Sequence, residues 1–351
     1  MNEITRDPVR VALVGYGLGG QLQAPLIDAT DGLQLTAVVT TNAERVRALG
    51  VKHPGARAVT RLRDVLGEVE LVVIETPNPT HVELAREALN AGCHVAVDKP
   101  VCASSREAWE LVHLASATGR VFSVVHQRRW DDDYLTASKV VREQRLGQVD
   151  LFEWRWDRWH PEVRVGAWRE DPEQDGGMLL DLGSHGVDQA VQLLGPVRSV
   201  YAELDCRRPG ARVDDTMFLA LEHEGGARSH LSVSVHGADS MPRMRIVSRD
   251  ATFVSTGLDP QDAAVLAGTS PNDPAFGLRE TPDWASLHDG DGAHPVDVVR
   301  GDWRAFYRGL HAAIRDGAPP PVTGADGAGV VTLLEHARRS ATERRVIDLA
   351  S

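Results

Sequence analysis

The sequence predicts an α/β protein with two domains: a doubly wound parallel sheet, then a domain built on a large, mainly antiparallel open sheet. Three observations support this prediction. The length of 351 residues suits two domains of ordinary size. Up to residue 128, short β-branched runs alternate with amphipathic stretches, as in parallel sheets covered on both faces. Longer alternating runs follow, as in antiparallel sheets. We therefore expect domains at 1–128 and 129–351.

In the first domain, the alternation predicts strands separated by helices. The strands are expected at 10–14, 33–40, 56–59, 71–76, 94–97 and 121–125. The helices are expected at 19–29, 43–49, 62–66, 80–91 and 104–118.

In the second domain, a helix at 132–145 precedes long strands. These strands are expected at 150–159, 197–206, 214–224, 227–235 and 243–255. The stretch 259–292 is rich in Gly, Pro and Asp and is expected to be irregular, whereas 302–316 and 325–345 are expected to be helical.

Composition excludes several classes of function. The chain has 38 basic and 50 acidic residues, a net charge of −12, which disfavours a nucleic-acid partner. Cys93, Cys102 and Cys206 are too few and too scattered for a disulfide framework or a zinc site, so we expect no metal. The first eight residues lack an apolar signal-peptide core, and no apolar run is long enough to cross a membrane. We therefore expect a cytoplasmic protein with no membrane partner.

A glycine-rich turn directly follows the first strand and opens a helix. It reads Gly-Tyr-Gly-Leu-Gly-Gly at 15–20. In a Rossmann domain the first glycine permits the tight turn, the second lets the backbone approach a pyrophosphate, and the last allows close helix–strand packing. The alternative is a glycine-rich turn without a ligand. The expected cofactor contacts from this turn are Gly15, Tyr16, Gly17, Leu18 and Gly20.

The end of the second strand indicates which dinucleotide binds. An acidic residue there would hold the ribose hydroxyl of NAD. This chain has Thr40, Thr41 and Asn42, with Arg45 one turn further on. Hydroxyls, an amide and a cation suit a 2′-phosphate, so we favour NADP over NAD. The alternative is that Arg45 is a solvated charge on an exposed helix face.

Lys99 stands directly after the fifth strand, at the edge of the sheet where ligands bind in such folds. Pro100 stiffens its backbone. A lysine at a strand end is more often a solvated surface charge, so position alone does not make Lys99 catalytic.

A second candidate cluster lies in the second domain. Asp181 and His185 are four residues apart and share one face if the segment is helical, and Asp188 continues that face. A carboxylate beside an imidazole could relay a proton; the alternative is a buried histidine held by hydrogen bonds. Gly183 and Gly186 each cost about 1 kcal/mol inside a helix, so we expect a close approach to this backbone.

Taken together, these motifs resemble the Gfo/Idh/MocA family of oxidoreductases, which includes glucose–fructose oxidoreductases and inositol dehydrogenases. The resemblance rests on the glycine turn, on Thr-Pro-Asn at 76–78 with His81, on Asp-Lys-Pro at 98–100, and on Gly-Gly…Asp…His at 176–185. Within the family the chain resembles the NADP-preferring scyllo-inositol dehydrogenase branch. That likeness lies at 97–100, 126–131, 157–164 and 257–261.

The resemblance implies roles for individual residues. The family's catalytic lysine, aspartate and histidine fall on Lys99, Asp181 and His185. It also implies further cofactor contacts from Thr76, Pro77, Asn78, His81, Asp98, Lys99 and Gln127. Two departures could reshape the pocket: Asp98 stands where the family more commonly has Glu, and Gln127 where it usually has Asn.

The implied reaction is hydride transfer between the nicotinamide and a secondary alcohol or ketone of a small polyol or sugar. His185 would take the hydroxyl proton, Lys99 would stabilise the developing alkoxide, and Asp181 would orient the imidazole. The alternatives are an NAD-dependent glycosidase on the same scaffold, another sugar dehydrogenase such as an aldose 1-dehydrogenase, and a catalytically silent nucleotide sensor.

Aromatic and basic residues gather at the start of the second domain. Five of the eight tryptophans lie between residues 130 and 168, among arginines and acids that suit a hydroxyl-rich ring. The alternative is that the tryptophans fill the core. The candidate substrate contacts are Arg128, Trp156, Arg158, Trp159, Arg164 and Trp168.

The resemblance also implies how the second domain is used. Part of the C-terminal tail packs back against the first domain in family members. An open sheet face with apolar residues favours association, so we expect a homodimer or homotetramer formed through it.

Overall fold

The computed structural model describes residues 7–238, 241–281 and 283–349. Residues 1–6, which carry most of the expectation about a signal peptide, lie outside the described part. The chain forms two compact units. The first contains the chain up to Gln127, with Gln261–Phe276 and Trp303–Ala328. The second contains Arg128–Pro260, Gly277–Asp302 and the chain after Ala328.

The first unit is a parallel sheet of six strands in the order β3-β2-β1-β4-β5-β6, which is the Rossmann order and confirms the predicted fold. The strands are β1 (Val9–Val14), β2 (Leu33–Val39), β3 (Arg57–Val59), β4 (Leu71–Ile74), β5 (His94–Asp98) and β6 (Phe122–Val125). The helices are α1 (Leu18–Asp28), α2 (Ala43–Lys52), α3 (His81–Asn90), α4 (Ser105–Thr118), α7 (Gln261–Leu266) and α8 (Arg304–Asp316). The expected helix at 62–66 is only a 3₁₀ turn at Leu62–Asp64.

Local chemistry sets the helix ends in this unit. The side chain of Asn42 accepts hydrogen bonds from the backbone amides of Glu44 and Arg45 and thereby starts α2. Ser104 starts α4 in the same way, and Gly119 in a left-handed conformation ends it. Strand β4 is buried along its length, and so is β1 apart from Arg10, as expected for a sheet covered on both faces.

The second unit is built on a nine-stranded sheet in the order β14-β13-β12-β11-β7-β10-β9-β8-β15. Neighbours are antiparallel except β7 and β10, so the sheet is mainly antiparallel as predicted. The strands are β7 (Val149–Asp157), β8 (Val197–Asp205), β9 (Thr216–His223), β10 (Arg228–Ser234), β11 (Met244–Ser248), β12 (Thr252–Ser255), β13 (Ala285–Asp289), β14 (Gly292–Pro295) and β15 (Ile347–Asp348).

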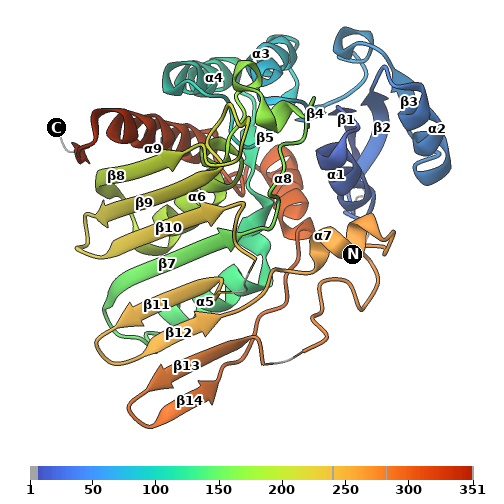
Figure 1. Cartoon of the computed structure of the whole chain (residues 1–351). Coiled ribbons are helices and arrows are strands. Elements are labelled where there is room, and N and C mark those ends of the chain that lie inside the picture. The colour runs from blue at the N-terminus through green and yellow to red at the C-terminus, as the bar shows by residue number, and fades with distance from the viewer. Residues whose placement is uncertain (1–6, 239–240, 282, 350–351) are drawn as a thin grey trace. The chain divides into compact units, whose positions relative to one another are not determined.

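Helices α5 (Asp132–Arg142) and α6 (Ser184–Leu194) lie behind this sheet in Figure 1, and its front face carries no helix of the described residues in this unit. Burial alternates along β9, so every second side chain faces the core and the others face outward. Helix α9 (Gly324–Glu343) begins in the first unit and continues in the second. No described helix is both long and apolar enough to span a membrane.

Two predictions about the chain after residue 128 are wrong in detail. The single strand expected at 243–255 is a hairpin of β11 and β12, because the hydroxyl of Ser248 accepts hydrogen bonds from the amides of Asp250 and Ala251 and forms a tight turn. The stretch expected to be irregular contains α7 and the strand β13, which pairs with β14 through a short turn at Asp289. The first turn interrupts the alternation with three consecutive polar residues, Ser248, Arg249 and Asp250, which the single-strand prediction overlooked, and the second hairpin is too polar to show a strand pattern.

Candidate active site

The glycine-rich turn has the steric properties expected of a dinucleotide cradle. Gly15 has φ +92°, and a Cβ there would overlap the carbonyl oxygen of Glu75. A Cβ on Gly20 would overlap the carbonyl oxygen of Gly15, so both positions require glycine for the fold itself. A Cβ on Gly17 would meet only an Arg45 nitrogen, 3.9 Å away. The open space is therefore at Gly17, where a ligand would approach the start of α1.

Tyr16 and Leu18, which separate these glycines, differ in their exposure. Leu18 is exposed at the first turn of α1. The Tyr16 ring is buried edge-on against His53, with ring centroids 6.1 Å apart. Burial and the nearby carboxylate of Asp28 raise the pKa of Tyr16. Tyr16 therefore offers its backbone to a ligand, whereas its side chain packs inside the unit.

The end of β2 places a cation near the glycine turn. Asn42 is committed to capping α2, and the Thr40 hydroxyl accepts a long hydrogen bond of 3.4 Å from the Asn42 amide. The guanidinium of Arg45 reaches back from α2 toward Gly17. The residue is exposed, yet its side chain points to the turn that would hold a dinucleotide.

The loop after β4 is fixed to the turn after β5 by His81, which is fully buried. Its ring nitrogens lie 3.0 Å from the carbonyl oxygen of Pro100 and 2.8 Å from that of Thr76. The hydroxyl of Thr80 donates to the hydroxyl of Thr76, 2.7 Å away, or to the carbonyl oxygen of Pro77, 2.8 Å away. His81 thus positions this loop and the Lys99 turn relative to each other.

Lys99 is 8% exposed, which rules out a solvated surface charge. Its backbone amide donates to the carboxylate of Asp98 at 2.8 Å. Glu75, at the end of β4, lies beside both residues. Burial, and then the charge of Asp98, raise the pKa of Glu75, while Lys99 opposes the shift. Sequence reasoning missed Glu75; the available signal was an acid immediately after a fully apolar strand.

In the second unit, Asp181 does not lie on a regular α-helix. Residues Leu179–Gly183 form a π-helical turn that leads into α6. Asp214 anchors this turn, because its carboxylate accepts a 2.6 Å hydrogen bond from the Leu179 amide. The expected shared face of Asp181 and His185 assumed 3.6 residues per turn, and the wider π-turn changes that geometry.

Both predicted catalytic groups of the second unit are buried. Asp181 is 9% exposed and His185 4% exposed. The Nε of Arg169 lies 3.3 Å from the carboxylate of Asp181, and the Arg169 guanidinium stacks over the Trp168 ring at 4.3 Å. Arg169 therefore places a cation beside the carboxylate of Asp181.

The glycines of this segment are explained by packing. A Cβ on Gly183 would lie 2.7 Å from the sulfur of Met217, and one on Gly186 would lie 3.1 Å from the Trp154 ring. The expected close approach to this backbone is therefore confirmed, and it is made by side chains of the sheet, Met217 on β9 and Trp154 on β7.

Asp188, which the sequence places on the same face as Asp181 and His185, is held by an arginine. Its two carboxylate oxygens accept hydrogen bonds from Arg129 Nε at 2.9 Å and Nη2 at 2.6 Å. Both side chains are buried, so this is a bidentate internal ion pair.

Asp188 is one of several acids paired with arginine in the second unit. Arg128 pairs with Asp131, Arg279 with Asp132, and Arg243 with Asp133. Burial lowers the pKa of Arg243 to about 10, and Asp133 partly offsets this. The Arg-Arg-Trp-Asp-Asp-Asp segment at 128–133 therefore serves a buried ionic network.

The candidate substrate residues fall into two groups. Trp156 is in the core, with the guanidinium groups of Arg128, Arg243 and Arg158 within 4.5, 4.2 and 5.1 Å of its ring centroid. Trp159 is 58% exposed. Arg164 is exposed and Trp168 half-buried. Of the six candidate substrate residues, Trp159, Arg164 and Trp168 therefore have side chains at the surface, where they are available to a ligand.

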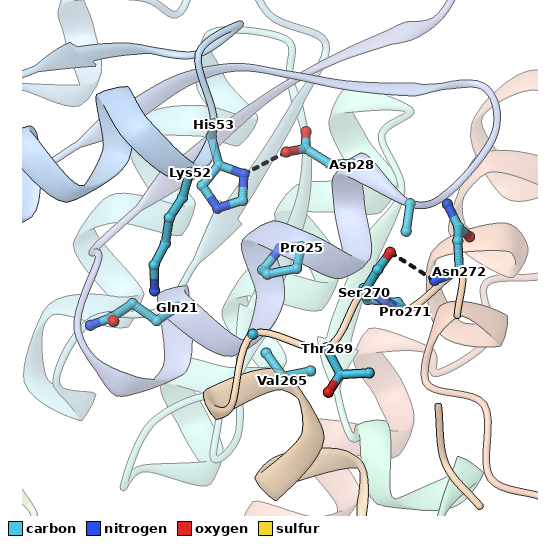
Figure 2. A pocket seen from close by; sticks show the side chains of 12 residues that line it. Gln21, Pro25, Asp28, Lys52, His53, Val265, Thr269, Ser270, Pro271 and Asn272 are labelled. Atoms are coloured by element: carbon cyan, nitrogen blue, oxygen red, sulfur yellow. Dashed lines mark hydrogen bonds and ion pairs between the residues drawn. The ribbon is translucent and has the colours of Figure 1, made fainter. Parts of the chain in front are cut away.

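The first unit also has a cavity of about 330 Å³ where α1 and α2 end, shown in Figure 2. His53 lies in its wall, with Nδ1 2.5 Å from the carboxylate of Asp28, and Lys52 and Gln21 line one side. The cavity runs along α1 from Gln21 to Asp28, and neither Gly15 nor Gly17 lines it. Among the described residues, no group of three or more His, Cys, Asp or Glu side chains could hold a metal ion.

Two sequence profiles match most of the chain. Residues 9–126 match an oxidoreductase family with an NAD-binding Rossmann fold. Residues 134–254 match the GFO/IDH/MocA C-terminal domain.

Several relatives are similar to this chain. It is 32% identical to scyllo-inositol 2-dehydrogenase (NADP(+)) IolW of Bacillus subtilis, over 98% of this chain and 96% of the relative. It is 28% identical to D-glucoside 3-dehydrogenase of Escherichia coli, over 64% and 69% of the two chains. The solved structure of oxidoreductase yvaA from Bacillus subtilis superposes with a TM-score of 0.92 at 32% identity, over 98% of this chain and 99% of that one.

The sheet order, the glycine turn and the two profile matches agree with one another. They place a nicotinamide-cofactor domain and a second domain of one recognised type in a single chain. The chain therefore belongs to the Gfo/Idh/MocA family of oxidoreductases and is related to inositol and glucoside dehydrogenases.

Proposed function

We propose that this chain is an NADP-preferring dehydrogenase that transfers a hydride between the nicotinamide and a secondary alcohol or ketone of a cyclitol or sugar, in the manner of scyllo-inositol dehydrogenases. A scyllo-inositol 2-dehydrogenase that matches nearly the whole chain supports this substrate class. The observation that carries the proposal is the burial of Lys99 beside Asp98 and Glu75, at the end of the sheet where ligands bind in such folds.

The residues of the first unit suit a dinucleotide. Gly17 leaves the start of α1 open, and a diphosphate is favoured at a helix N-terminus. The buried Glu75 Oε1 and Gln127 Oε1 make no hydrogen bond with any described residue, as expected for groups that await a polar ligand. When bound, the nicotinamide supplies the hydride acceptor, or the donor in the reverse direction.

Each proposed catalytic group acts at a stated atom. The Lys99 ammonium donates a hydrogen bond to the substrate oxygen and stabilises the negative charge that develops there. A ring nitrogen of His185 accepts the hydroxyl proton. Asp181, whose carboxylate lies 3.3 Å from Arg169 Nε, stabilises the resulting imidazolium. The assignment of these three residues to one reaction rests on the family resemblance.

The test mixes purified protein with NADP or NAD and a panel of cyclitols, aldoses and glycosides. A dehydrogenase accumulates reduced cofactor far beyond the amount of enzyme. Oxidation of aldoses alone would indicate an aldose 1-dehydrogenase. Release of an aglycone without net cofactor reduction would indicate a glycosidase. No turnover of any panel member, with the cofactor bound, would contradict the proposal.

Arg45 should determine the preference for NADP. We expect Arg45→Ala to weaken NADP binding about tenfold or more, because a charged hydrogen bond to a phosphate is worth about 1.5–3 kcal/mol. NAD binding should change little, since NAD has no 2′-phosphate. The dissociation constants can be measured by fluorescence titration. Arg47→Ala, on the exposed part of the same helix, is the control. An equal loss of affinity for NADP and for NAD in Arg45→Ala would contradict this role.

We further propose that the protein forms a dimer or tetramer through the open sheet face. Phe218 on β9 lies against His230 on β10 on that face, with ring centroids 5.7 Å apart. Phe218→Glu would place a charge there, so we expect light scattering to show a shift to a smaller species. Glu224→Lys, in the turn after β9, should leave the assembly unchanged. A wild-type monomer would contradict the proposal.

A further inference from the structure

Glu75 is a buried acid in the first unit that takes no part in the proposed hydride and proton transfers. It follows β4, whose four residues are all buried, and it is only 7% exposed. Its Oε1 makes no hydrogen bond with any described residue. Since an ionised carboxylate is costly to bury without full hydrogen bonding, this position favours the neutral acid.

The carboxyl group of Glu75 lies against the first turn of α1. A Cβ placed on Gly19 would overlap its Oε2, so the acid packs directly on the helix backbone at this turn. The turn contains no acidic residue, and its cap Gly17 has no side chain to satisfy the helix amides. The N-terminus of α1 is therefore left with its positive end available to an anion, and the carboxyl group of Glu75 lies against this turn.

The groups around Glu75 come from two further elements. Strands β4 and β5 pair in parallel with Ile74 opposite Val97, which brings Glu75 beside Asp98 and Lys99. From α8, Tyr307 faces the same acids, and its hydroxyl lies 2.8 Å from the amide oxygen of Gln23. Burial and the Asp98 charge raise the pKa of Glu75, and Lys99 lowers it less strongly. The same acids, together with burial, raise the pKa of Tyr307.

We propose that Glu75 is a further cofactor-binding residue: as the neutral acid it supports dinucleotide binding at the start of α1, and as the carboxylate it weakens that binding. This inference rests on the proposed use of the glycine turn as the diphosphate site. The neutral acid has an O–H that can donate to a ligand oxygen. The carboxylate can only accept, and its charge repels phosphate at short range.

The sign of the pH effect follows from this assignment. A raised pKa means that Glu75 stays protonated above the ordinary range of a carboxyl group. As the pH rises through the raised pKa, the carboxylate forms and cofactor affinity falls. Cofactor binding should in turn raise this pKa further, because each equilibrium biases the other.

The test compares wild type with Glu75→Gln, which keeps the size and a donor but cannot ionise. The dissociation constant for NADP is measured by fluorescence titration from pH 5 to about pH 9.5. At each pH the wild-type constant is divided by the Glu75→Gln constant. Titration of the cofactor's own phosphate cancels in this ratio. We expect the ratio to be near one at the acid end and to rise about tenfold at the alkaline end, equivalent to about 1.4 kcal/mol.

One control variant and one alternative replacement make the result decisive. Glu83→Gln, an exposed acid on α3, should show the wild-type pH profile. If Glu75→Gln does not fold, as judged by its melting temperature without cofactor, then Glu75→Met serves as the neutral replacement. A ratio that does not change with pH overturns the inference and leaves the proposed function intact. Failure of every variant and of wild type to bind NADP or NAD at any pH would overturn both.

Discussion

Lys99→Ala is expected to lower kcat about 10²-fold or more while NADP binding is retained, because the variant loses the donor that stabilises charge on the reacting oxygen. The effect should be on turnover, since the interaction strengthens as the alkoxide develops. Steady-state kinetics with the best substrate of the panel, and fluorescence titration of NADP, measure the two quantities separately. Because Lys99 is buried, a loss of turnover in Lys99→Ala could not be attributed to a change in surface charge.

A matched control is available in the same unit. Lys52 is exposed at the end of α2, and Lys52→Ala should keep wild-type turnover. Lys99→Arg retains the charge in a larger, planar group, so it should recover only part of the activity. Near-normal turnover in Lys99→Ala would remove this lysine from the mechanism and leave the assignment of His185 without its electrostatic partner.

The architecture could be predicted from the sequence where periodicity and turn chemistry agree. Strand β2 was expected at 33–40 and runs over Leu33–Val39, because its aliphatic and β-branched residues, of which Leu33, Leu35, Ala37 and Val38 are buried, favour a strand within a packed sheet. The hairpin at 248–252 was missed because the two short strands that flank it were taken as one alternating run, although the buried positions shift by one residue across the three polar residues at 248–250. Its turn depends on one hydroxyl, that of Ser248, which composition does not reveal.

The candidate site was predictable where the reason is local. Gly15 and Gly20 are required by atoms a few residues away or on the neighbouring strand, and the motif encodes both requirements. The use of Asp188 could not be predicted, because its partner Arg129 lies 59 residues away in the chain. Glu75 was missed for a similar reason: its environment comes from β5, α1 and α8, which only the folded chain brings together.

Asp188→Ala should mainly destabilise the protein. Its carboxylate and the Arg129 guanidinium are 3% and 10% exposed and form two hydrogen bonds, so removing the acid deprives a buried cation of its bidentate partner. Breaking such a pair typically costs about 3–5 kcal/mol of unfolding free energy. Urea unfolding measures this loss directly. The fraction that remains folded should turn over substrate at close to the wild-type rate.

Two comparisons separate burial from charge. Asp205 and Arg207 form an equally short but exposed pair, so Asp205→Ala should cost less than about 1 kcal/mol. Replacing both buried partners, as Arg129→Met with Asp188→Leu, should recover most of the stability lost in Asp188→Ala, since no unpaired charge remains. If Asp188→Ala instead kept its stability and lost turnover, Asp188 would belong to the proton relay after all, and the ion pair with Arg129 would be incidental to the fold.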